Sequence, residues 1–223
     1  MNNINVAALF SGGKDSTFSI YYAINQGFDV KCLITIEPIE DSMYWHYPNI
    51  KWVNLQSKAM EIPYIKIFEN YENLVEILKF VKKEFDVNGL LSGVIYSDFQ
   101  KDFLIRVCRK VGLKLFTPLW MKDPFRLLKI IVNCGIHSII VLVAAYGLDE
   151  NWLGREINTE TINDLLTKSR KYGISVCGEG GEYETFVYDA PFFKKRILLK
   201  DFEKRWFGDR GILHIKSAEL ICK

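Results

Sequence analysis

The chain has 223 residues and a formal net charge of +2, with 49% hydrophobic and 25% charged residues. This length can bury one sizeable core, or a main domain with a smaller second one, and the composition is ordinary for a globular enzyme. The near-neutral charge argues neither for nor against a nucleic-acid partner, and the longest apolar run, residues 138–146, is too short to cross a bilayer.

The polar start of the chain leads directly into an apolar run without the pattern of a secretory signal, so we expect a cytoplasmic protein. The five cysteines are odd in number, widely spread and never arranged as CxxC, which argues against a disulfide scaffold and against a zinc or iron–sulfur knuckle. Most are expected to be small buried hydrophobes; they are Cys32, Cys108, Cys134, Cys177 and Cys222.

The first 115 or so residues alternate short apolar runs with helical patterns. Residues 49–62 also carry apolar residues near helical spacing. The alternation predicts right-handed crossovers and a parallel sheet covered on both faces. The predicted strands are 4–10, 30–36, 63–68 and 89–96, and the predicted helices are 16–25, 71–85 and 98–112.

The pattern changes after residues 116–120. A helix is predicted over 123–135, a buried strand over 138–146 and a further helix over about 158–172. The last 35 or so residues alternate short β-like pieces with turns and suggest a small mixed or antiparallel sheet. We therefore expect an α/β fold with two parts, residues 1–117 and a smaller α+β region over residues 118–223.

Residues 11–16, SGGKDS, end the first predicted strand and open the first predicted helix. Glycines let main-chain N–H groups approach an anion, and a helix N-terminus adds donors and partial positive charge. Lys14 supplies a full charge for phosphate oxygens, and the two serines supply hydroxyl donors. Asp15 would repel a phosphate, so it is expected to cap the helix or to hold a Mg²⁺ that bridges phosphates. The turn is predicted to bind phosphate.

This turn is neither a Walker A loop nor GxGxxG. It resembles the PP-loop of the ATP pyrophosphatase superfamily, whose members cleave ATP between the α and β phosphates and adenylate a carboxylate or carbonyl oxygen. The resemblance implies a HUP-like, adenine nucleotide alpha hydrolase-like fold, with residues 11–16 on the departing pyrophosphate and Lys14 stabilising its charge. It also implies that the end of the second strand, at Ile34 and Thr35, lies near adenine.

Four further motifs indicate which family of this superfamily the sequence resembles. They are residues 45–63, 92–120, 147–157 and 177–197. In this order, and with the PP-loop, they look like the diphthine–ammonia ligase family, and GEGGEYET (178–185) is the most specific of them. The resemblance implies that ATP and ammonium convert the diphthine carboxylate of elongation factor 2 to diphthamide, with AMP and pyrophosphate as products. The chain departs from the family where Phe99 and Lys101 replace the usual Tyr and Arg around Gln100, and Arg and Lys are not equivalent at a bidentate site.

Glu179, Glu182 and Glu184 lie within six residues, and carboxylates so close repel one another unless a cation lies between them. A solvated acidic loop is the alternative. The substrate side chain carries a trimethylammonium group and the second substrate is ammonium, so these carboxylates could bind either cation or deprotonate ammonium. Tyr183 could add a cation–π face. Trp45, His46 and Asn49 could line the mouth of the site or be structural.

The implied site residues are catalytic, metal-binding, ATP-binding or substrate-binding. The catalytic group is Lys14, Asp15, Glu182 and Glu184, and Asp15 is also the metal ligand. The ATP-binding group is Ser11, Gly12, Gly13, Lys14, Asp15, Ser16, Ile34 and Thr35. The substrate-binding group is Ser97, Asp98, Gln100, Asp149, Gly178, Glu179, Gly180, Gly181, Glu182, Tyr183 and Glu184.

The expected cofactors are ATP and Mg²⁺, and the expected partners are elongation factor 2 and ammonium. We expect no direct nucleic-acid or membrane partner and leave open a homodimer. Two alternatives remain. One is a tRNA- or small-molecule-modifying enzyme on the same scaffold, with Cys177 as sulfur carrier. The other is a non-catalytic regulator that binds adenine nucleotide.

Overall fold

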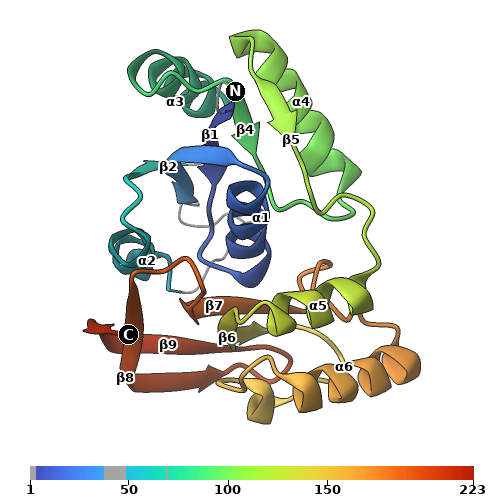
Figure 1. Ribbon diagram of the computed structural model, residues 1–223. Helices are drawn as coiled ribbons and strands as arrows, with labels where there is room; N and C mark the ends of the chain where they lie inside the picture. Colours follow the sequence, from blue (N-terminus) through green and yellow to red (C-terminus); the bar gives the residue numbers. More distant parts are fainter. Residues whose placement is uncertain (1–3, 38–48, 69) are drawn as a thin grey trace. The chain divides into compact units, whose positions relative to one another are not determined.

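The computed structural model describes residues 4–37, 49–68 and 70–223 (Figure 1). The chain divides into two compact units, each with its own sheet. Among the described residues, the first unit contains 4–11, 15–37, 61–68 and 70–120, and the second contains 12–14, 49–60 and 121–223. Three residues of the SGGKDS turn are therefore grouped with the C-terminal half of the chain.

The first unit is built on a five-stranded sheet in the order β3-β2-β1-β4-β5. All four neighbouring pairs are parallel, which confirms the predicted α/β class. Parallel strands have their carboxyl ends at one edge of the sheet, where α/β proteins bind ligands. The strands are β1 (Ile4–Leu9), β2 (Phe28–Glu37), β3 (Tyr64–Phe68), β4 (Gly89–Leu91) and β5 (Lys114–Phe116).

In the described part of the chain, the helices that accompany this sheet are α1 (Lys14–Asn25), α3 (Tyr71–Glu84) and α4 (Asp98–Val111). Figure 1 shows α3 and α4 on one side of the sheet and α1 on the other. Apolar side chains of α3 and α4, such as Leu78 and Val107, join Ala7 and Ile34 of the strands in one buried cluster. Both faces of the parallel sheet are therefore covered, as the alternation of elements predicts.

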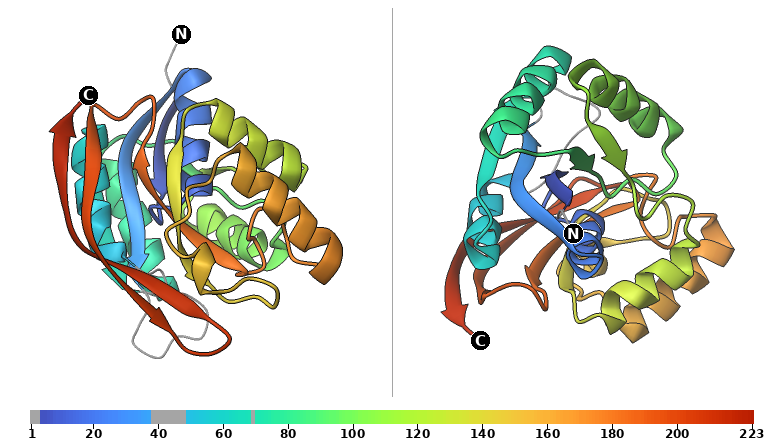
Figure 2. Two further views of the ribbon diagram at one scale, coloured as in Figure 1. Left: turned by 90° about the horizontal axis from the view of Figure 1, so that it is seen from below. Right: turned by 45° about the horizontal axis from the view of Figure 1, so that its top comes forward.

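The second unit has a four-stranded sheet in the order β7-β6-β9-β8, and its strand pairs are antiparallel. Strands β8 and β9 form a long hairpin, which Figure 2 shows in red and orange. This sheet confirms the predicted antiparallel C-terminal region. Its strands are β6 (His137–Val143), β7 (Tyr183–Asp189), β8 (Lys195–Trp206) and β9 (Gly211–Cys222).

The helices of the second unit include α5 (Pro124–Asn133) and α6 (Thr159–Tyr172), which lie side by side in Figures 1 and 2. The unit also includes α2 (Val53–Met60), whose Ala59 carbonyl accepts a hydrogen bond from the Lys194 amide. Two short 3₁₀ turns, η1 (Ile50–Trp52) and η2 (Glu150–Trp152), complete it. Among the helices of the described chain, none combines the length and the apolar character that a bilayer span requires.

The structure corrects several predicted boundaries. The strand predicted over residues 89–96 ends at Leu91, because the following segment turns before α4 begins. Strand β5, of three residues, was not predicted, since so short a run carries no clear periodicity. Helix α1 begins at Lys14, two residues earlier than predicted, so the lysine of the turn is already helical.

Candidate functional site

The main chain of the Gly12–Lys14 turn is bonded to the outer edge of β7. The amide of Val187 donates to the carbonyl of Gly12 at 3.0 Å, and the amide of Lys14 donates to the Thr185 hydroxyl at 3.1 Å. Gly12 has φ +85°, in the left-handed region that favours glycine. The turn is therefore hydrogen-bonded to β7 on the side of this strand that faces away from β6.

Lys14 connects this turn to the segment that precedes β7. Its side chain is 3% exposed, and its Nζ donates to the carbonyl of Cys177 at 2.6 Å. The same Nζ lies 5.1 Å from the centre of the Tyr183 ring, within the range of a cation–π contact. A buried ammonium needs such partners because desolvation of an isolated charge is expensive. The structure thus brings together the two motifs that the sequence singled out, SGGKDS and GEGGEYET.

The segment between Cys177 and Tyr183 depends on its glycines. Gly178 and Gly181 have φ of +72° and +84°. A Cβ on Gly178 would lie 2.7 Å from the Tyr183 carbonyl oxygen and 2.8 Å from the Tyr183 ring, so a larger residue does not fit there. The Tyr183 hydroxyl in turn donates to the carbonyl of Val176 at 2.7 Å. Tyr183 is fully buried and holds the two ends of this loop together.

Glu182 uses both of its carboxylate oxygens on main-chain donors of the same loop. Oε1 accepts from the amide of Ser175 at 2.7 Å, and Oε2 accepts from the amide of Gly180 at 2.8 Å. A carboxylate that accepts two backbone N–H bonds organises the chain around it. A catalytic role for Glu182 stays a prediction, and these contacts indicate how its side chain is oriented.

Glu179 is half-buried in the loop, and Glu184 lies on β7 opposite Leu142 of β6. Side chains alternate along a strand, so Glu184 leaves β7 on the face opposite to Tyr183 and Thr185. Glu182 therefore directs its carboxylate to the main chain of its own loop, whereas Glu184 projects from one face of β7.

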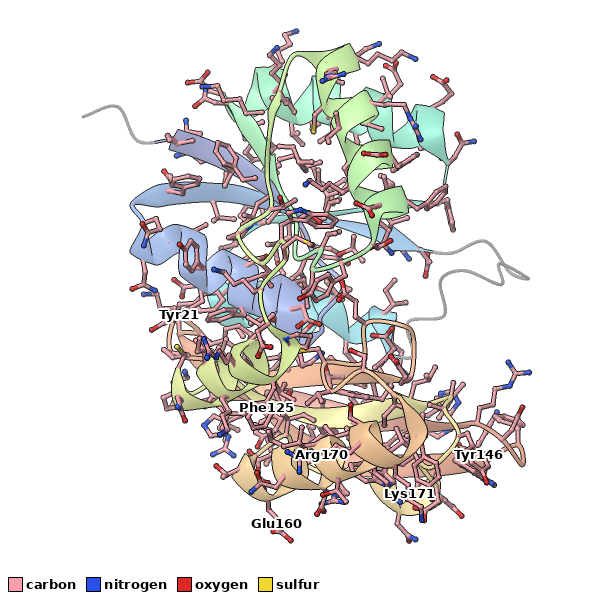
Figure 3. All side chains as sticks on the ribbon, turned by 90° about the vertical axis from the view of Figure 1, so that its right-hand side faces the viewer. Tyr21, Phe125, Tyr146, Glu160, Arg170 and Lys171 are labelled. Carbon is pink, nitrogen blue, oxygen red and sulfur yellow. The ribbon has the colours of Figure 1, made fainter. Side chains whose placement is uncertain are left out.

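The segment after β6 lies beside this loop, because the amide of Ala144 donates to the Glu182 carbonyl at 2.9 Å. Within it, Tyr146 is 86% exposed and meets the Tyr172 ring edge-on, with ring centres 5.2 Å apart; Figure 3 shows it beside Lys171. Asp149 caps η2, since its Oδ1 accepts from the amide of Asn151 at 3.0 Å.

The remaining residues of the turn belong to the first unit. The hydroxyls of Ser11 and Ser16 are 3.2 Å apart, and the Ser16 hydroxyl also accepts from the Ser11 amide at 3.4 Å. Asp15 is in the first turn of α1, where a carboxylate is favoured. A Cβ on Gly93 would lie 2.9 Å from the main chain of Asp15, so the segment after β4 passes close to the start of α1.

Ile34 and Thr35, predicted to lie near adenine, are buried on β2. The Thr35 hydroxyl donates to the Phe10 carbonyl at 2.9 Å, and the Phe10 amide donates to the Ile34 carbonyl at 2.9 Å. Both residues therefore hold the end of β1, from which the turn departs.

Ser97, Asp98 and Gln100 start helix α4 in the first unit. The Ser97 side chain caps the helix by accepting from the Gln100 amide at 3.3 Å. Lys101, one of the two positions at which the sequence analysis finds a departure, lies with its Nζ 3.8 Å from the centre of the Trp120 ring. Phe99 is 77% exposed. Lys101 therefore makes a cation–π contact with Trp120.

Sequence reasoning missed Gln56 and Thr185 as parts of the site. Gln56 is completely buried on α2 and donates through Nε2 to the carbonyls of Gly12, at 2.9 Å, and Val187, at 2.7 Å. The only signal for it was a polar residue among the apolar positions of a helical pattern. Trp45 and His46 lie outside the described residues. Asn49 bonds to β9, through the Leu213 carbonyl and the Ile215 amide.

Cys177 is buried, and its thiol donates to the Pro124 carbonyl at 2.9 Å. Cys32 and Cys108 are also buried, which raises the pKa of Cys32 to about 12 and that of Cys108 to about 11. In the part of the chain that the structure describes, no group of three or more His, Cys, Asp and Glu side chains could hold a metal ion.

Comparison with known families gives matches over most of the chain. Residues 4–115 match the family described as the diphthamide synthase N-terminal domain, and residues 123–221 match the diphthamide synthase C-terminal domain. The diphthine–ammonia ligases of Bos taurus and Homo sapiens are each 34% identical over 226 residues, which cover 90% of this chain and 84% of each relative.

A solved structure from Methanocaldococcus jannaschii, described as a predicted subunit of tRNA methyltransferase, aligns with a TM-score of 0.44 at 15% identity. The alignment covers 84% of this chain and 98% of that one.

Proposed function

Because the chain belongs to the diphthamide synthase family, we propose that it forms the amide of diphthamide from diphthine, ammonium and ATP. The diphthine carboxylate attacks the α-phosphorus of ATP and displaces pyrophosphate, which gives an acyl-adenylate. Ammonia then attacks the acyl carbon, and AMP leaves. The protein substrate in this proposal is elongation factor 2, and the reaction is taken to occur in the cytoplasm.

The contacts of the Gly12–Lys14 turn with Cys177 and β7 support this proposal most directly. Lys14 of the phosphate-binding turn is bonded to the carbonyl of Cys177, immediately before GEGGEYET, and the turn itself is bonded to β7. A nucleotide whose phosphates lie on Gly12–Lys14 would therefore have its reactive end beside the motif that is most specific to the family. This juxtaposition supports a single site for ATP cleavage and substrate activation.

Lys14 would supply the charge for the first step. Negative charge builds up on the leaving pyrophosphate, and a positioned ammonium in a site that excludes water stabilises it strongly. Lys14 is already desolvated and oriented by the Cys177 carbonyl and the Tyr183 ring, so little reorganisation would be needed. Gly12 and Gly13 would let the main chain approach the phosphates closely.

Mg²⁺ is usually bound by one or two carboxylates together with substrate phosphates. The residues of the turn therefore fit Mg²⁺ that is bound together with the phosphates of ATP. Asp15, in the first turn of α1, is the carboxylate proposed to hold it. When bound, the ion would neutralise part of the phosphate charge.

The carboxylates of the 178–184 segment would receive the cationic groups. Diphthine carries a trimethylammonium group and the second substrate is ammonium, and carboxylates bind both and can accept a proton from the latter. Glu179, Glu182 and Glu184 are the carboxylates proposed for these roles. Ser97, Asp98, Gln100 and Asp149 are proposed to contact the protein substrate, and a homodimer is left open.

The experiment that tests the proposal combines the protein with ATP, isotopically labelled ammonium and diphthine-bearing elongation factor 2. AMP and pyrophosphate should form only when all three are present, and the label should appear in the factor. AMP formation without the factor, or no AMP under any condition, would contradict the proposal. The second outcome would favour a nucleotide-binding regulator.

Sulfur transfer through Cys177 is disfavoured by its complete burial and by the hydrogen bond from its thiol to Pro124. Reactive cysteines are usually at least partly exposed. Replacement of Cys177 by serine should leave turnover nearly unchanged; loss of turnover in a folded variant would reopen the sulfur-transfer alternative.

A further inference from the structure

Gln56 is a buried amide between the phosphate-binding turn and β7. Its side chain is 0% exposed, and both hydrogens of its Nε2 are used, on the carbonyls of Gly12 and Val187. Because an amide nitrogen has only two hydrogens, these two carbonyls determine how the side chain is oriented. Neither the motifs of the sequence nor the family comparison assigns a role to this residue.

The Gly12 carbonyl accepts two hydrogen bonds, from the Gln56 side chain at 2.9 Å and from the Val187 amide at 3.0 Å. A carbonyl oxygen has two lone pairs, so both are occupied. The direction of this carbonyl is therefore set by two donors that come from different elements, α2 and β7.

This has a consequence for the next residue. The Gly12 carbonyl and the Gly13 N–H belong to one planar trans peptide, in which they point in opposite directions. Two donors on the Gly12 oxygen thus direct the Gly13 N–H away from Gln56 and β7. Without them, a Gly-Gly peptide could rotate with little steric resistance, because glycine has the widest range of backbone angles.

Gln56 also fills the space where Gly12 lacks a side chain. Its Oε1 lies 2.5 Å from the position that a Cβ on Gly12 would occupy, and this oxygen has no hydrogen-bond partner among the described residues. The side chain is thus packed directly against the glycine whose carbonyl it binds. Movement of Gly12 would disturb Gln56, and movement of Gln56 would release Gly12.

We propose that Gln56 is a positioning residue for phosphate binding, which acts by fixing the orientation of the Gly12–Gly13 peptide in the turn that takes the pyrophosphate part of ATP. The proposal rests on the proposed function, since it takes the turn to be the phosphate site. Gln56 does not itself touch the nucleotide. Its effect should therefore be confined to ligands that carry the β and γ phosphates.

The test replaces Gln56 with methionine, which has similar length and flexibility but no donors. The matched control is Asn49→Ala in the same Pro48–Met60 segment. Asn49 is also buried and also makes two hydrogen bonds to main-chain groups, but these groups lie on β9. Kd values for ATP, inorganic pyrophosphate and AMP are measured by calorimetry for the wild type and both variants.

Gln56→Met should weaken binding of ATP and pyrophosphate by about 10-fold, the size of one lost hydrogen bond to a charged group, and leave the affinity for AMP unchanged. Asn49→Ala should lower the melting temperature without changing any of the three affinities. Equal weakening of all three ligands by Gln56→Met, or unchanged pyrophosphate affinity in a folded variant, would overturn the inference. A wild type that binds neither ATP nor pyrophosphate would instead overturn the proposed function.

A second measurement does not depend on the folding of a variant. In the wild type, titration with pyrophosphate should shift the NMR signal of the Gly13 amide, because this amide belongs to the peptide that Gln56 orients. If other amides of the turn respond while that of Gly13 does not, the inference is wrong.

Discussion

The ammonium of Lys14 donates a 2.6 Å hydrogen bond to the carbonyl of Cys177, which lies 163 positions later in the chain. This bond joins the Gly12–Lys14 turn to the loop that leads into β7, within the second unit. The phosphate oxygens of a nucleotide would have to share the Lys14 ammonium with the Cys177 carbonyl, or replace this carbonyl as its acceptor. Lys14 is thus buried and oriented by groups of the protein itself.

Replacement of Lys14 by methionine should lower the rate of ATP cleavage by at least about 100-fold, the usual cost of removing one group that stabilises developing charge. The methionine keeps the apolar stem of the side chain, so the melting temperature should change little. Diphthine-dependent AMP formation and thermal unfolding are measured on the same samples. A variant that folds and keeps wild-type turnover would show that Lys14 has no part in the chemistry.

Replacement of Glu182 can distinguish a role in orienting the loop from a role in catalysis. Alanine leaves the amides of Ser175 and Gly180 without acceptors and should destabilise the protein by about 1–3 kcal/mol. Glutamine keeps one acceptor oxygen and should restore part of both stability and turnover. Hydrogen exchange at these two amides should rise in the alanine variant and less in the glutamine variant.

A catalytic base would behave differently at the same position. Glutamine cannot accept a proton in the relevant pH range, so it would abolish turnover as completely as alanine even where the loop is intact. Urea unfolding and kcat for the two variants therefore distinguish the roles. Equal loss of kcat in a glutamine variant of normal stability would assign Glu182 to catalysis.

Much of the fold follows from local patterns, and the site follows from them less completely. The parallel sheet can be predicted because strand–helix alternation is a local property, and Lys14 can be proposed as a phosphate ligand because SGGKDS is contiguous. Gln56 was missed because its partners, Gly12 and Val187, are 44 and 131 positions away in the sequence. A long-range hydrogen bond to main-chain carbonyls leaves no periodic signal, and its donor is recognised only when the elements have been assembled.

Glu182 illustrates a related difficulty. Three carboxylates in six residues suggest a shared cationic ligand, but the positive φ of Gly178 and Gly181 folds the loop so that Glu182 binds its own main chain. The charge pattern is visible in the sequence, while the backbone geometry that directs each side chain is not. Glycines in the sequence indicate where such a turn is allowed. They do not indicate which N–H groups of the turn will bind a side chain.

The pH dependence of stability should contain a contribution from Glu156. Burial alone would raise the pKa of this carboxyl, but hydrogen bonds with His137, at 3.0 Å, and Tyr188, at 2.7 Å, outweigh burial and lower it. A lowered pKa in the folded state means that the stabilisation is complete above the ordinary value of 4.5 and is lost as the pH falls through the folded value. The group is partly exposed, so the contribution should be below about 1 kcal/mol.

Urea unfolding of the wild type and of Glu156→Gln, at about pH 6 and about pH 4, checks this. The variant should be less stable than the wild type at the higher pH, and the difference should shrink at the lower pH. Asp164→Asn is a control on another exposed carboxylate, whose ion pair is with Arg155 instead. A difference between wild type and Glu156→Gln that grows on acidification would contradict the assignment.

The coupling between Gly12 and Gln56 can be measured as a free energy. Gly12→Ala places a Cβ at φ +85° and 2.5 Å from Gln56 Oε1, whereas Gly27→Ala places one at φ +82° with no heavy atom within 4 Å. Backbone strain of about 1–2 kcal/mol is common to both. The Gly12 variant should cost about 1–3 kcal/mol more, because Gln56 can move aside only by giving up its two hydrogen bonds.

A double-mutant cycle isolates this extra cost. In a Gln56→Ala background the Cβ meets no side-chain amide, so Gly12→Ala should then cost about as much as Gly27→Ala does in the same background. Urea unfolding of the single and double variants gives the interaction energy directly. A cost of Gly12→Ala that is the same with and without Gln56 would mean that the two residues are not energetically coupled, and that the left-handed backbone alone requires glycine at position 12.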